Sequence, residues 1–337
     1  MDTLPPQTLR RWLIHLLAWI AGITLLLSPL APQAGEKWPE KEIHLVVPWP
    51  AGGPSDVMAR ILAKELSAGL GQPVVVENRA GATGTIGARH VARSKADGYT
   101  LLFGNTVALV GAVVSSPEPV QFDPVRDFAP IALLAETVYI LTAHPSAGVR
   151  NYPEFIARAR DPAKPPVAVG STGNGATSDI LYDWLTHHQQ ANLTKIAFKG
   201  TAPLVADLIA GHLPVGSAGL SLAQPYYKEG KLHPLVIVGS KRLPELPDVP
   251  SARELGLNAP DLTVWDGLFA PAGTPPAILA QLRDAVQKAA RSEELGAFAS
   301  KNGSTTVFIA GEAAAFRVRK DLAERQQFRD GLPARRN

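Results

Sequence analysis

The sequence contains no cysteine among its 337 residues. This absence excludes disulfides, thiolate metal sites and a cysteine nucleophile. It also excludes a lipid anchor on a cysteine at a processed N-terminus. Charge is sparse as well: 19% of the residues are charged, the net charge is +3, and no run of five like charges occurs. Because the basic residues are scattered, the composition argues against a nucleic-acid partner.

Sequence motifs of several enzyme classes are also missing. There is no G-x-S-x-G, no G-x-x-x-x-G-K-[ST] and no H-E-x-x-H, and the glycines at 81, 84 and 87 do not form G-x-G-x-x-G. His187 and His188 are adjacent, so on a helix they point about 100° apart and make a poor chelate. Asp56 is the one candidate for a general base, although an aspartate in a first helical turn more often complements the helix dipole. We therefore predict no catalytic residue, no metal site and no cofactor.

The N-terminal segment has the parts of a secretory signal. Arg10 and Arg11 precede an almost wholly apolar stretch at 12–30, and small residues near Ala34 lead into a polar region. The alternative is a single membrane anchor, because the apolar run approaches the roughly 20 residues that span a bilayer. Pro29 and the small residues after it favour cleavage. We predict a signal peptide over 1–34 and a periplasmic protein that is not a lipoprotein.

From residue 42 onward, apolar strand patterns alternate with helical patterns of ten to fifteen residues. This alternation predicts an α/β protein with mostly parallel sheets. Two series of such units indicate two lobes. In open α/β sheets, ligands bind at the carboxyl ends of the strands, where the connecting loops lie.

Four strand-to-helix loops are rich in glycine and small hydroxylated residues. They are PAGGPSD at 50–56, NRAGATGTIG at 78–87, STGNGATSD at 171–179 and FKGTAP at 198–203. Free N–H groups at a helix start, with the positive end of the helix dipole, form an anion site. Each loop taken alone also fits an ordinary cap or turn. Their joint occurrence at one sheet edge favours a shared polar cleft that holds an anion.

Two tryptophans stand beside these loops at expected strand ends. Trp49 follows the first strand and Trp265 precedes a short apolar run. Either side chain can belong to the core. The alternative is that both wall the cleft, since ligand pockets are mostly apolar and exclude water.

Several segments together resemble the Bug/TctC family, the periplasmic substrate-binding proteins of tripartite tricarboxylate transporters, also called Bordetella uptake gene products. The similar segments include KEIHLVVPWPAGGPSDVMARILAKEL, LGQPVVVENRAGATGTIGARHVA, DGYTLLFG, FDPVRDFAPIALLAE, VGSTGNGATSDIL, FKGTAPLVADLIAG, LPDVPSARELG and GLFAPAGTP. They follow the order of the family and cover nearly the whole chain after the signal segment. No single motif is decisive, but their joint occurrence is highly specific.

The resemblance implies a type II periplasmic-binding-protein-like α/β fold, with a ligand cleft between two lobes. The first lobe would comprise 35–136 plus 264–337 and the second 137–263. It also implies a non-enzymatic, monomeric receptor for a small carboxylate: a dicarboxylate or tricarboxylate, an amino acid or an aromatic acid. Membrane transporter subunits would be the partners. A sensor subunit that presents ligand to a membrane signalling protein, or an enzyme on the same scaffold, remains an alternative.

The family pattern, together with the two tryptophans, predicts which residues contact the ligand. The predicted ligand-binding residues are Trp49, Ala51, Gly52, Gly53, Ser55, Asp56, Asn105, Thr106, Ser171, Gly173, Asn174, Gly175, Thr177, Ser178, Lys199, Gly200, Thr201, Ala202, Ala218 and Trp265. Two positions depart from the family: Ala218 replaces a usual aspartate and Phe198 a usual tyrosine. These departures suggest a less polar second lobe and a ligand with fewer donor groups on that side, such as an aromatic or branched acid.

Overall fold

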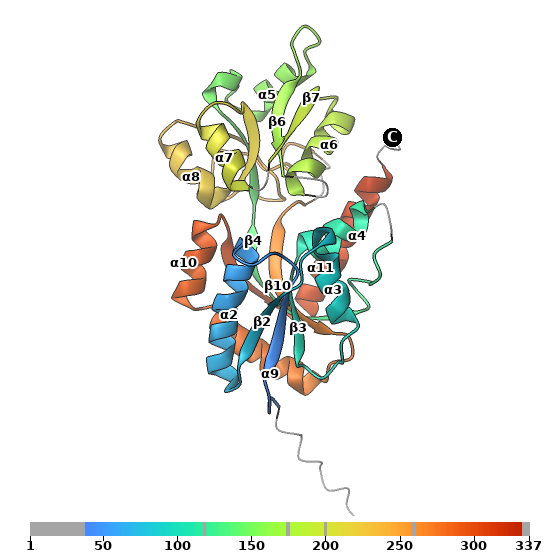
Figure 1. The fold of residues 1–337 in the computed structure, drawn as a ribbon. Helices are drawn as coiled ribbons and strands as arrows, with labels where there is room; N and C mark the ends of the chain where they lie inside the picture. Colours follow the sequence, from blue (N-terminus) through green and yellow to red (C-terminus); the bar gives the residue numbers. More distant parts are fainter. Residues whose placement is uncertain (1–37, 117–118, 173–175, 199–200, 258–260, 332–337) are drawn as a thin grey trace, which may run out of the picture. The chain divides into compact units, whose positions relative to one another are not determined.

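The computed structural model describes residues 38–116, 119–172, 176–198, 201–257 and 261–331. The predicted signal peptide at 1–34 lies outside these residues. All of the helices and strands reported below belong to one compact unit, Lys41–Asn337. Two separate β-sheets, each with its own helices, define two lobes of this unit (Figure 1).

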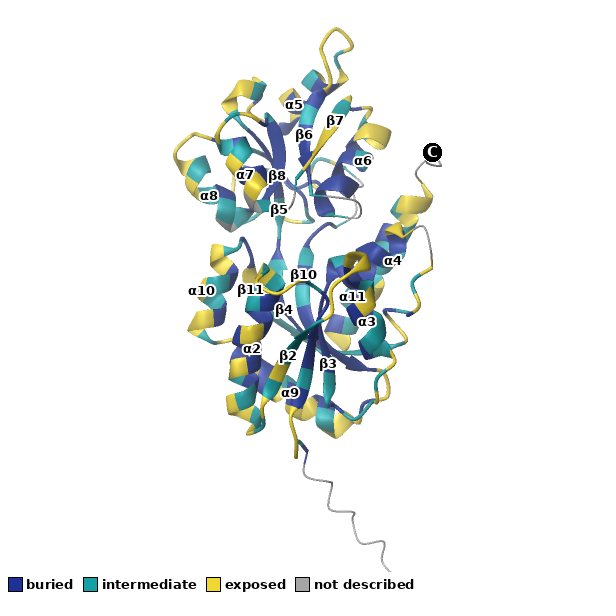
Figure 2. Cartoon of the chain, viewed as in Figure 1, coloured by how far each residue is buried: buried dark blue, intermediate teal, exposed yellow. Residues whose placement is uncertain are grey.

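The first sheet has six strands in the order β11-β4-β10-β3-β1-β2. The strand bounds are β1 Ile43–Val47, β2 Val74–Asn78, β3 Thr100–Asn105, β4 Phe128–Thr137, β10 Val264–Pro271 and β11 Thr305–Ala310. The helices of the same lobe are α2 Pro54–Leu70, α3 Thr85–Ala92, α4 Ala112–Ser115, α9 Pro276–Ala289, α10 Glu293–Lys301 and α11 Glu312–Asp330. β1 is apolar along most of its length because a central parallel strand is buried on both faces (Figure 2).

The second sheet has five strands in the order β7-β6-β8-β5-β9. The strand bounds are β5 Tyr139–Ala143, β6 Val167–Ser171, β7 Leu193–Ala197, β8 Val215–Gly219 and β9 His233–Ile237. The helices that accompany them are α5 Tyr152–Arg160, α6 Thr177–Gln189, α7 Thr201–Ile209 and α8 Leu220–Lys228. Asn151 caps α5 by accepting a hydrogen bond from the backbone N–H of Glu154 at 2.9 Å.

The sheets are mixed, which corrects the expectation of mostly parallel pairing. β1 pairs in parallel with β2 and β3, and β6 pairs in parallel with β7 and β8. In contrast, β10 is antiparallel to β3 and β4, β11 to β4, and β5 to β8 and β9. The chain passes from the first lobe to the second between β4 and β5, and it returns to the first lobe at β10. These three strands are antiparallel to their neighbours in the sheets.

Each sheet has a hydrophobic core of its own. One core gathers Val46, Leu102, Phe269 and the side chains that pack around them, and the other gathers Phe155, Val169, Trp184 and theirs. α11 reaches both cores, because its Val318 is buried in the first while Phe328 packs against the second. Within the part of the chain that the structure describes, no helix combines the length and apolar character that crossing a bilayer requires.

Candidate functional site

A cavity of about 440 Å³ lies where strand ends and helix starts of both lobes meet. Its first-lobe wall is formed by the start of α2, the end of β3 and the first residues of β10. Its second-lobe wall is formed by the starts of β5, α6 and α7 and by the end of β8. This is the position at which open α/β sheets bind ligands. Of the predicted site residues, the cavity wall includes Ser55, Asn105, Thr177, Ser178 and Thr201.

The PAGGPSD loop is held in place by Asp56. The Asp56 carboxylate is 2% exposed and accepts hydrogen bonds from Gly52 N (2.8 Å), Arg60 Nε (2.9 Å) and Asn78 Nδ2 (2.8 Å). The hydrogen bond from Arg60 is the largest of the causes that lower the pKa of Asp56 to about 2, and burial opposes it. Asp56 is therefore an ionised anchor whose oxygens are engaged within the protein. The N–H of Gly52 is occupied by this anchor, and Ala51 and Gly52 are exposed outside the cavity wall.

The start of α2 is the part of this loop that reaches the cavity. Pro54 and Ser55 both line the wall, and no side chain caps the helix among the described residues. The first N–H groups of a helix lack intrahelical acceptors, and proline has no N–H to offer. The N–H of Ser55 is thus a donor at the positive end of a seventeen-residue helix.

The second lobe contributes a similar helix start. Thr172, Thr177 and Ser178 line the cavity, and α6 begins without a side-chain cap in the described part of the chain. Ser171 instead donates to Asp179 Oδ1 at 3.2 Å, and Asp179 pairs with Lys195 at 2.8 Å. These contacts fix the position of the loop. The predicted residues Gly173, Asn174 and Gly175 lie outside the described residues.

The next loop adds Thr201, whose hydroxyl forms a hydrogen bond with Tyr139, another residue of the cavity wall. Lys199 and Gly200 lie outside the described residues. Ala202 belongs to α7, and its side chain lies outside the described set as well.

Three other predicted site residues do not line the cavity. Thr106 is fully buried, and its hydroxyl accepts a hydrogen bond from the backbone N–H of Trp265 at 2.8 Å. The Trp265 side chain is also fully buried, and its Nε1 donates to Asp321 at 2.8 Å. Trp265 thus packs in the core instead of walling the cavity. Trp49 is partly buried, and its carbonyl accepts from Asn78 at 3.1 Å; its side chain is not part of the cavity wall.

Ala218 illustrates the alternation of a strand. Its neighbours Ser217 and Gly219 line the cavity, whereas Ala218 is fully buried in the core beneath α7, which Phe198 also contacts. Successive side chains of a strand point to opposite faces. A change of residue at 218 or 198 therefore alters packing and not the cavity wall. The two family departures give no structural basis for the expected aromatic or branched acid.

The second glycine loop, 78–87, corrects another expectation, since none of its residues lines the cavity. A Cβ atom on Gly87 would lie 2.9 Å from Arg79 O and from Pro48 Cβ. Gly84 has φ +89°, and a Cβ there would lie 2.7 Å from Ala108 Cβ. These glycines permit close packing of α3 and the preceding turn. Residues of the other three glycine-rich loops line the cavity.

Asp266 lines the cavity, although it is not among the residues predicted from the sequence. It lies on β10 opposite Asn105, one residue beyond Trp265. Burial raises the pKa of Asp266 to about 6, although hydrogen bonds from Asn105 and Ser55 act in the opposite direction. The sequence does contain a signal for this residue, an aspartate within the apolar run VWDGLFAP. Burying a carboxylate in an apolar strand is energetically costly, so such a residue is a candidate for a binding role.

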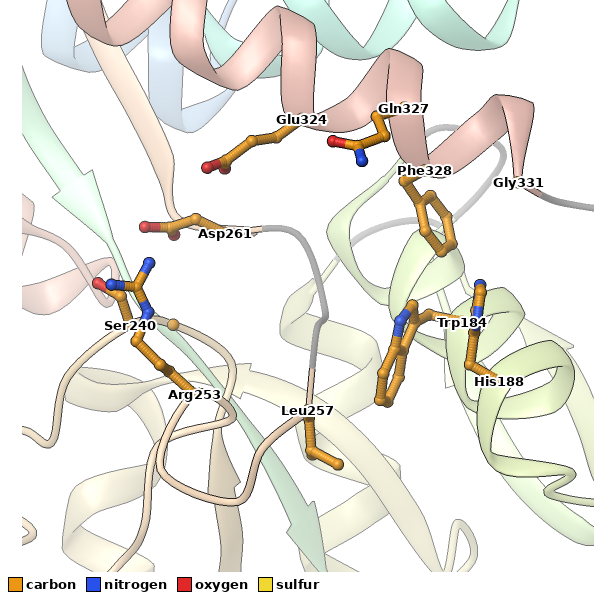
Figure 3. A pocket seen from close by; sticks show the side chains of 11 residues that line it. Trp184, His188, Ser240, Arg253, Leu257, Asp261, Glu324, Gln327, Phe328 and Gly331 are labelled. Carbon is orange, nitrogen blue, oxygen red and sulfur yellow. The ribbon is translucent and has the colours of Figure 1, made fainter.

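A second cavity, also of about 440 Å³, lies between the C-terminal parts of α6 and α11 (Figure 3). Phe328 faces His188, which stacks on Trp184 with ring centroids 5.8 Å apart. Asp261 and Glu324 also line this cavity. Arg253 lines it too, but the two carboxylates outnumber this one guanidinium, and the C-terminal ends of helices carry negative partial charge. This cavity is therefore the less suitable one for an anion. No group of acidic or histidine side chains that could hold a metal ion occurs within the described ranges.

Comparison with known proteins identifies the family of this chain. The sequence matches the family described as "Tripartite tricarboxylate transporter family receptor" (TctC) over residues 58–326. The chain belongs to this family. Protein BugT of Bordetella pertussis is 32% identical over 294 residues, which are 87% of this chain and 90% of BugT.

Solved structures of the TctC family show the same fold. A TctC solute binding protein from Polaromonas, solved with no ligand, has a TM-score of 0.75 and 28% identity over 88% of this chain and 100% of that one. MatC from Rhodopseudomonas palustris, solved with bound malate, has a TM-score of 0.69 and 32% identity over 87% of this chain and 100% of MatC. The predictions of a TctC solute-binding receptor and a two-lobed periplasmic-binding-protein fold are thereby confirmed.

Proposed function

We propose that this TctC receptor captures a small carboxylate in the cavity between its lobes and delivers it to membrane subunits of a tripartite tricarboxylate transporter. The convergence of helix starts from both lobes on one cavity is the observation that carries the proposal. Ser55 lies at the start of α2, Thr177 and Ser178 at the start of α6, and Thr201 at the start of α7. Free N–H groups and helix dipoles at these starts attract an anion without a basic side chain.

The remaining parts of the proposal follow from the family and the sequence. Residues 1–34 serve as a signal peptide, the protein works in the periplasm without a lipid anchor, and it acts as a monomer. The lobes comprise 35–136 plus 264–337 and 137–263. MatC holds malate, a dicarboxylate, which supports a carboxylate ligand here.

We further propose that the protein is a receptor and not an enzyme. Asp56, the one general base suggested by the sequence, has three hydrogen-bond donors on its carboxylate and a pKa lowered to about 2. Such a group is a poor proton acceptor at neutral pH, because a general base works best with a pKa near the operating pH. Asp266, whose pKa is raised to about 6, is the other carboxyl group to consider, because it lines the cavity. A receptor leaves the bound acid unchanged, which chromatography of the ligand after long incubation will check.

A thermal-shift screen of the purified protein against monocarboxylates, dicarboxylates, tricarboxylates, amino acids and aromatic acids tests the carboxylate site. A ligand at a hundredfold excess over its Kd adds about 2.7 kcal/mol to the free energy of unfolding. For a chain of this length, this gain corresponds to a rise in Tm of roughly 4 °C. We expect such a shift with at least one carboxylate class.

The double substitution Ser55→Leu and Thr177→Leu should abolish this shift, because both side chains would then block the helix starts. The matched control is Thr186→Leu with Ser300→Leu, which places the same changes on exposed positions of α6 and α10. The control protein should keep the full shift. The proposal fails if no carboxylate stabilises the wild-type protein, or if the blocked protein binds as well as the control.

A further inference from the structure

Asp266 gives the candidate cavity an unusual electrostatic feature. Among the described residues of the cavity wall, it is the one side chain that carries a charge at neutral pH. Asn105 and Ser55, the two residues bonded to it, are both neutral. Asn105 Oδ1 already accepts from Ala108 N at 3.0 Å, so its NH₂ group must be the donor to Asp266. A carboxylate has about four acceptor positions, and two neutral donors leave part of this capacity directed at the cavity.

A carboxylate in such a place is costly unless a cation meets it. Desolvation of an ionised carboxyl group is compensated more fully by a paired charge than by two neutral donors. Within the described part of the chain, no lysine, arginine or histidine lines this cavity. Since no described residue of the wall can pair with Asp266, a cationic group on the ligand is the partner that this part of the wall favours.

Ser55 lies next to both the start of α2 and Asp266. Its backbone N–H lies at the uncapped start of α2, where a carboxylate is favoured, and its hydroxyl donates to Asp266. One residue therefore contacts both the expected anion position and the aspartate. This proximity favours a ligand whose negative and positive groups are only a few bonds apart.

We propose that the ligand is an acid with a protonated amine beside its carboxylate, and that Asp266 selects it by pairing with the ammonium group. This inference rests on the proposed function, since it names the substrate class of the same cavity. Met58, Val107 and Leu222 form apolar parts of the wall that can receive the remainder of the ligand, and Ser217 offers a buried hydroxyl with no partner among the described residues. Asp266 thus determines specificity, and the helix starts provide general affinity for an acid.

The same atoms allow an opposite arrangement, in which a protonated Asp266 donates to a second carboxylate of the ligand. The two arrangements differ in their response to pH. The described groups that face Asp266 are Ser55 from α2, Asn105 from β3 and Tyr139 from β5, and burial raises the pKa of Tyr139 further above neutrality. None of them titrates between about pH 5 and pH 8, so the pH response in this range reports on Asp266.

Matched trios of ligands test the inference by calorimetric titration of the purified protein. Each trio keeps one carbon skeleton and changes an ammonium group to a hydroxyl or to hydrogen: aspartate, malate and succinate; leucine, leucic acid and isocaproate; phenylalanine, phenyllactate and phenylpropanoate. In the trio whose skeleton fits, we expect the amino acid to bind at least about tenfold more tightly than the other two members. A tenfold ratio is about 1.4 kcal/mol, which is within the range of one charge-assisted hydrogen bond.

Asp266→Asn should reduce that ratio to less than about threefold, because it retains the shape and the acceptor for Asn105 but removes the charge. Asp284→Asn, at an exposed position of α9, is the matched control and should leave the ratio unchanged. In the wild-type protein, lowering the pH from about 7.5 to about 5 should weaken amino-acid binding roughly tenfold, because protonation of Asp266 competes with the ammonium group. This pH test does not depend on the folding of any variant.

Three outcomes would overturn the inference: equal binding of the amino acid and its deaminated analogue, an affinity that rises as the pH falls, or an unchanged ratio in Asp266→Asn. If hydroxy or unsubstituted acids bind and amino acids do not, the selection by Asp266 is wrong while the carboxylate receptor stands. If no member of any trio and no acid of the wider screen binds, the proposed function itself fails.

Discussion

Asp56 and Asp266 bring the same carboxyl group into opposite surroundings. Asp56 has a cationic partner, Arg60, and its pKa falls to about 2, whereas Asp266 has only neutral donors and its pKa rises to about 6. The sequence suggested Asp56 because it stands in a glycine-rich loop. Asp266 was missed because its partners Ser55 and Asn105 are far from it in the chain, and only folding brings them together.

The charge of Asp266 should reduce the stability of the unliganded protein. Its folded-state pKa of about 6 exceeds its ordinary value of 3.8, so the folded state binds more protons between these values and stability falls as the pH rises through that window. A shift of this size corresponds to an upper bound of about 3 kcal/mol. Partial exposure of the residue reduces the effect, and we expect roughly 1–3 kcal/mol.

Asp266→Asn should therefore raise the free energy of unfolding by roughly 1–3 kcal/mol at about pH 7.5 and by much less near pH 4, where the wild-type carboxyl group is already protonated in the folded state. Urea unfolding curves at both pH values measure this difference. Asp284→Asn, which removes an exposed charge, should show no such dependence on pH. A destabilised Asp266→Asn protein at about pH 7.5 would contradict the expectation. Residues of functional sites often lower the stability of the folded protein, and the expected effect of Asp266 would be of this kind.

At the scale of secondary structure, the sequence predicted the βαβ units well and the returning strands poorly. α2 (Pro54–Leu70) and β6 (Val167–Ser171) are examples of this alternation of helical and strand patterns. These units have strong local patterns of apolar residues. The places of β10 and β11 in the sheet were not predicted, because they are determined by antiparallel pairing with β4, which follows from the passage of the chain between lobes. Such long-range pairing leaves no local signal.

The glycines of α3 and α2 differ in what surrounds them, and this difference can be tested. Alanine favours a helix over glycine by up to about 1 kcal/mol. At Gly69 of α2 the nearest atom to an added Cβ would be Ala285 Cβ at 3.9 Å, so Gly69→Ala should stabilise the protein by about 0.5–1 kcal/mol. At Gly87 of α3 the added Cβ would approach Arg79 O and Pro48 to 2.9 Å.

Gly87→Ala should therefore destabilise the protein by about 1–3 kcal/mol despite the better helix propensity, because the backbone of two packed segments must shift. Chemical denaturation of both variants and the wild type measures whether each substitution raises or lowers the free energy of unfolding. Ligand affinity should stay within about threefold of the wild-type value in each variant, since neither residue lines the cavity. Equal stabilisation by both substitutions would show that the close approach at Gly87 relaxes without cost.

At the scale of the whole molecule, ligand binding should couple the unfolding of the two hydrophobic cores. The cores under the two sheets are connected by the chain passages between lobes and by α11, which reaches both. Proteins with more than one such core often depart from two-state unfolding. A ligand that contacts α2 of one lobe and α6 of the other binds neither half-unfolded form, so it should stabilise both cores together.

Differential scanning calorimetry tests this coupling directly. Without ligand, we expect a broad heat-capacity peak whose calorimetric enthalpy exceeds the van't Hoff enthalpy. With the tightest acid of the trios at hundredfold excess, the whole peak should rise by roughly 4 °C and narrow toward two-state behaviour. The protein blocked by Ser55→Leu and Thr177→Leu should keep the broad peak. If the ligand raises only one component of the peak, it binds one lobe alone, and the pairing of the α2 and α6 helix starts around a single acid is wrong.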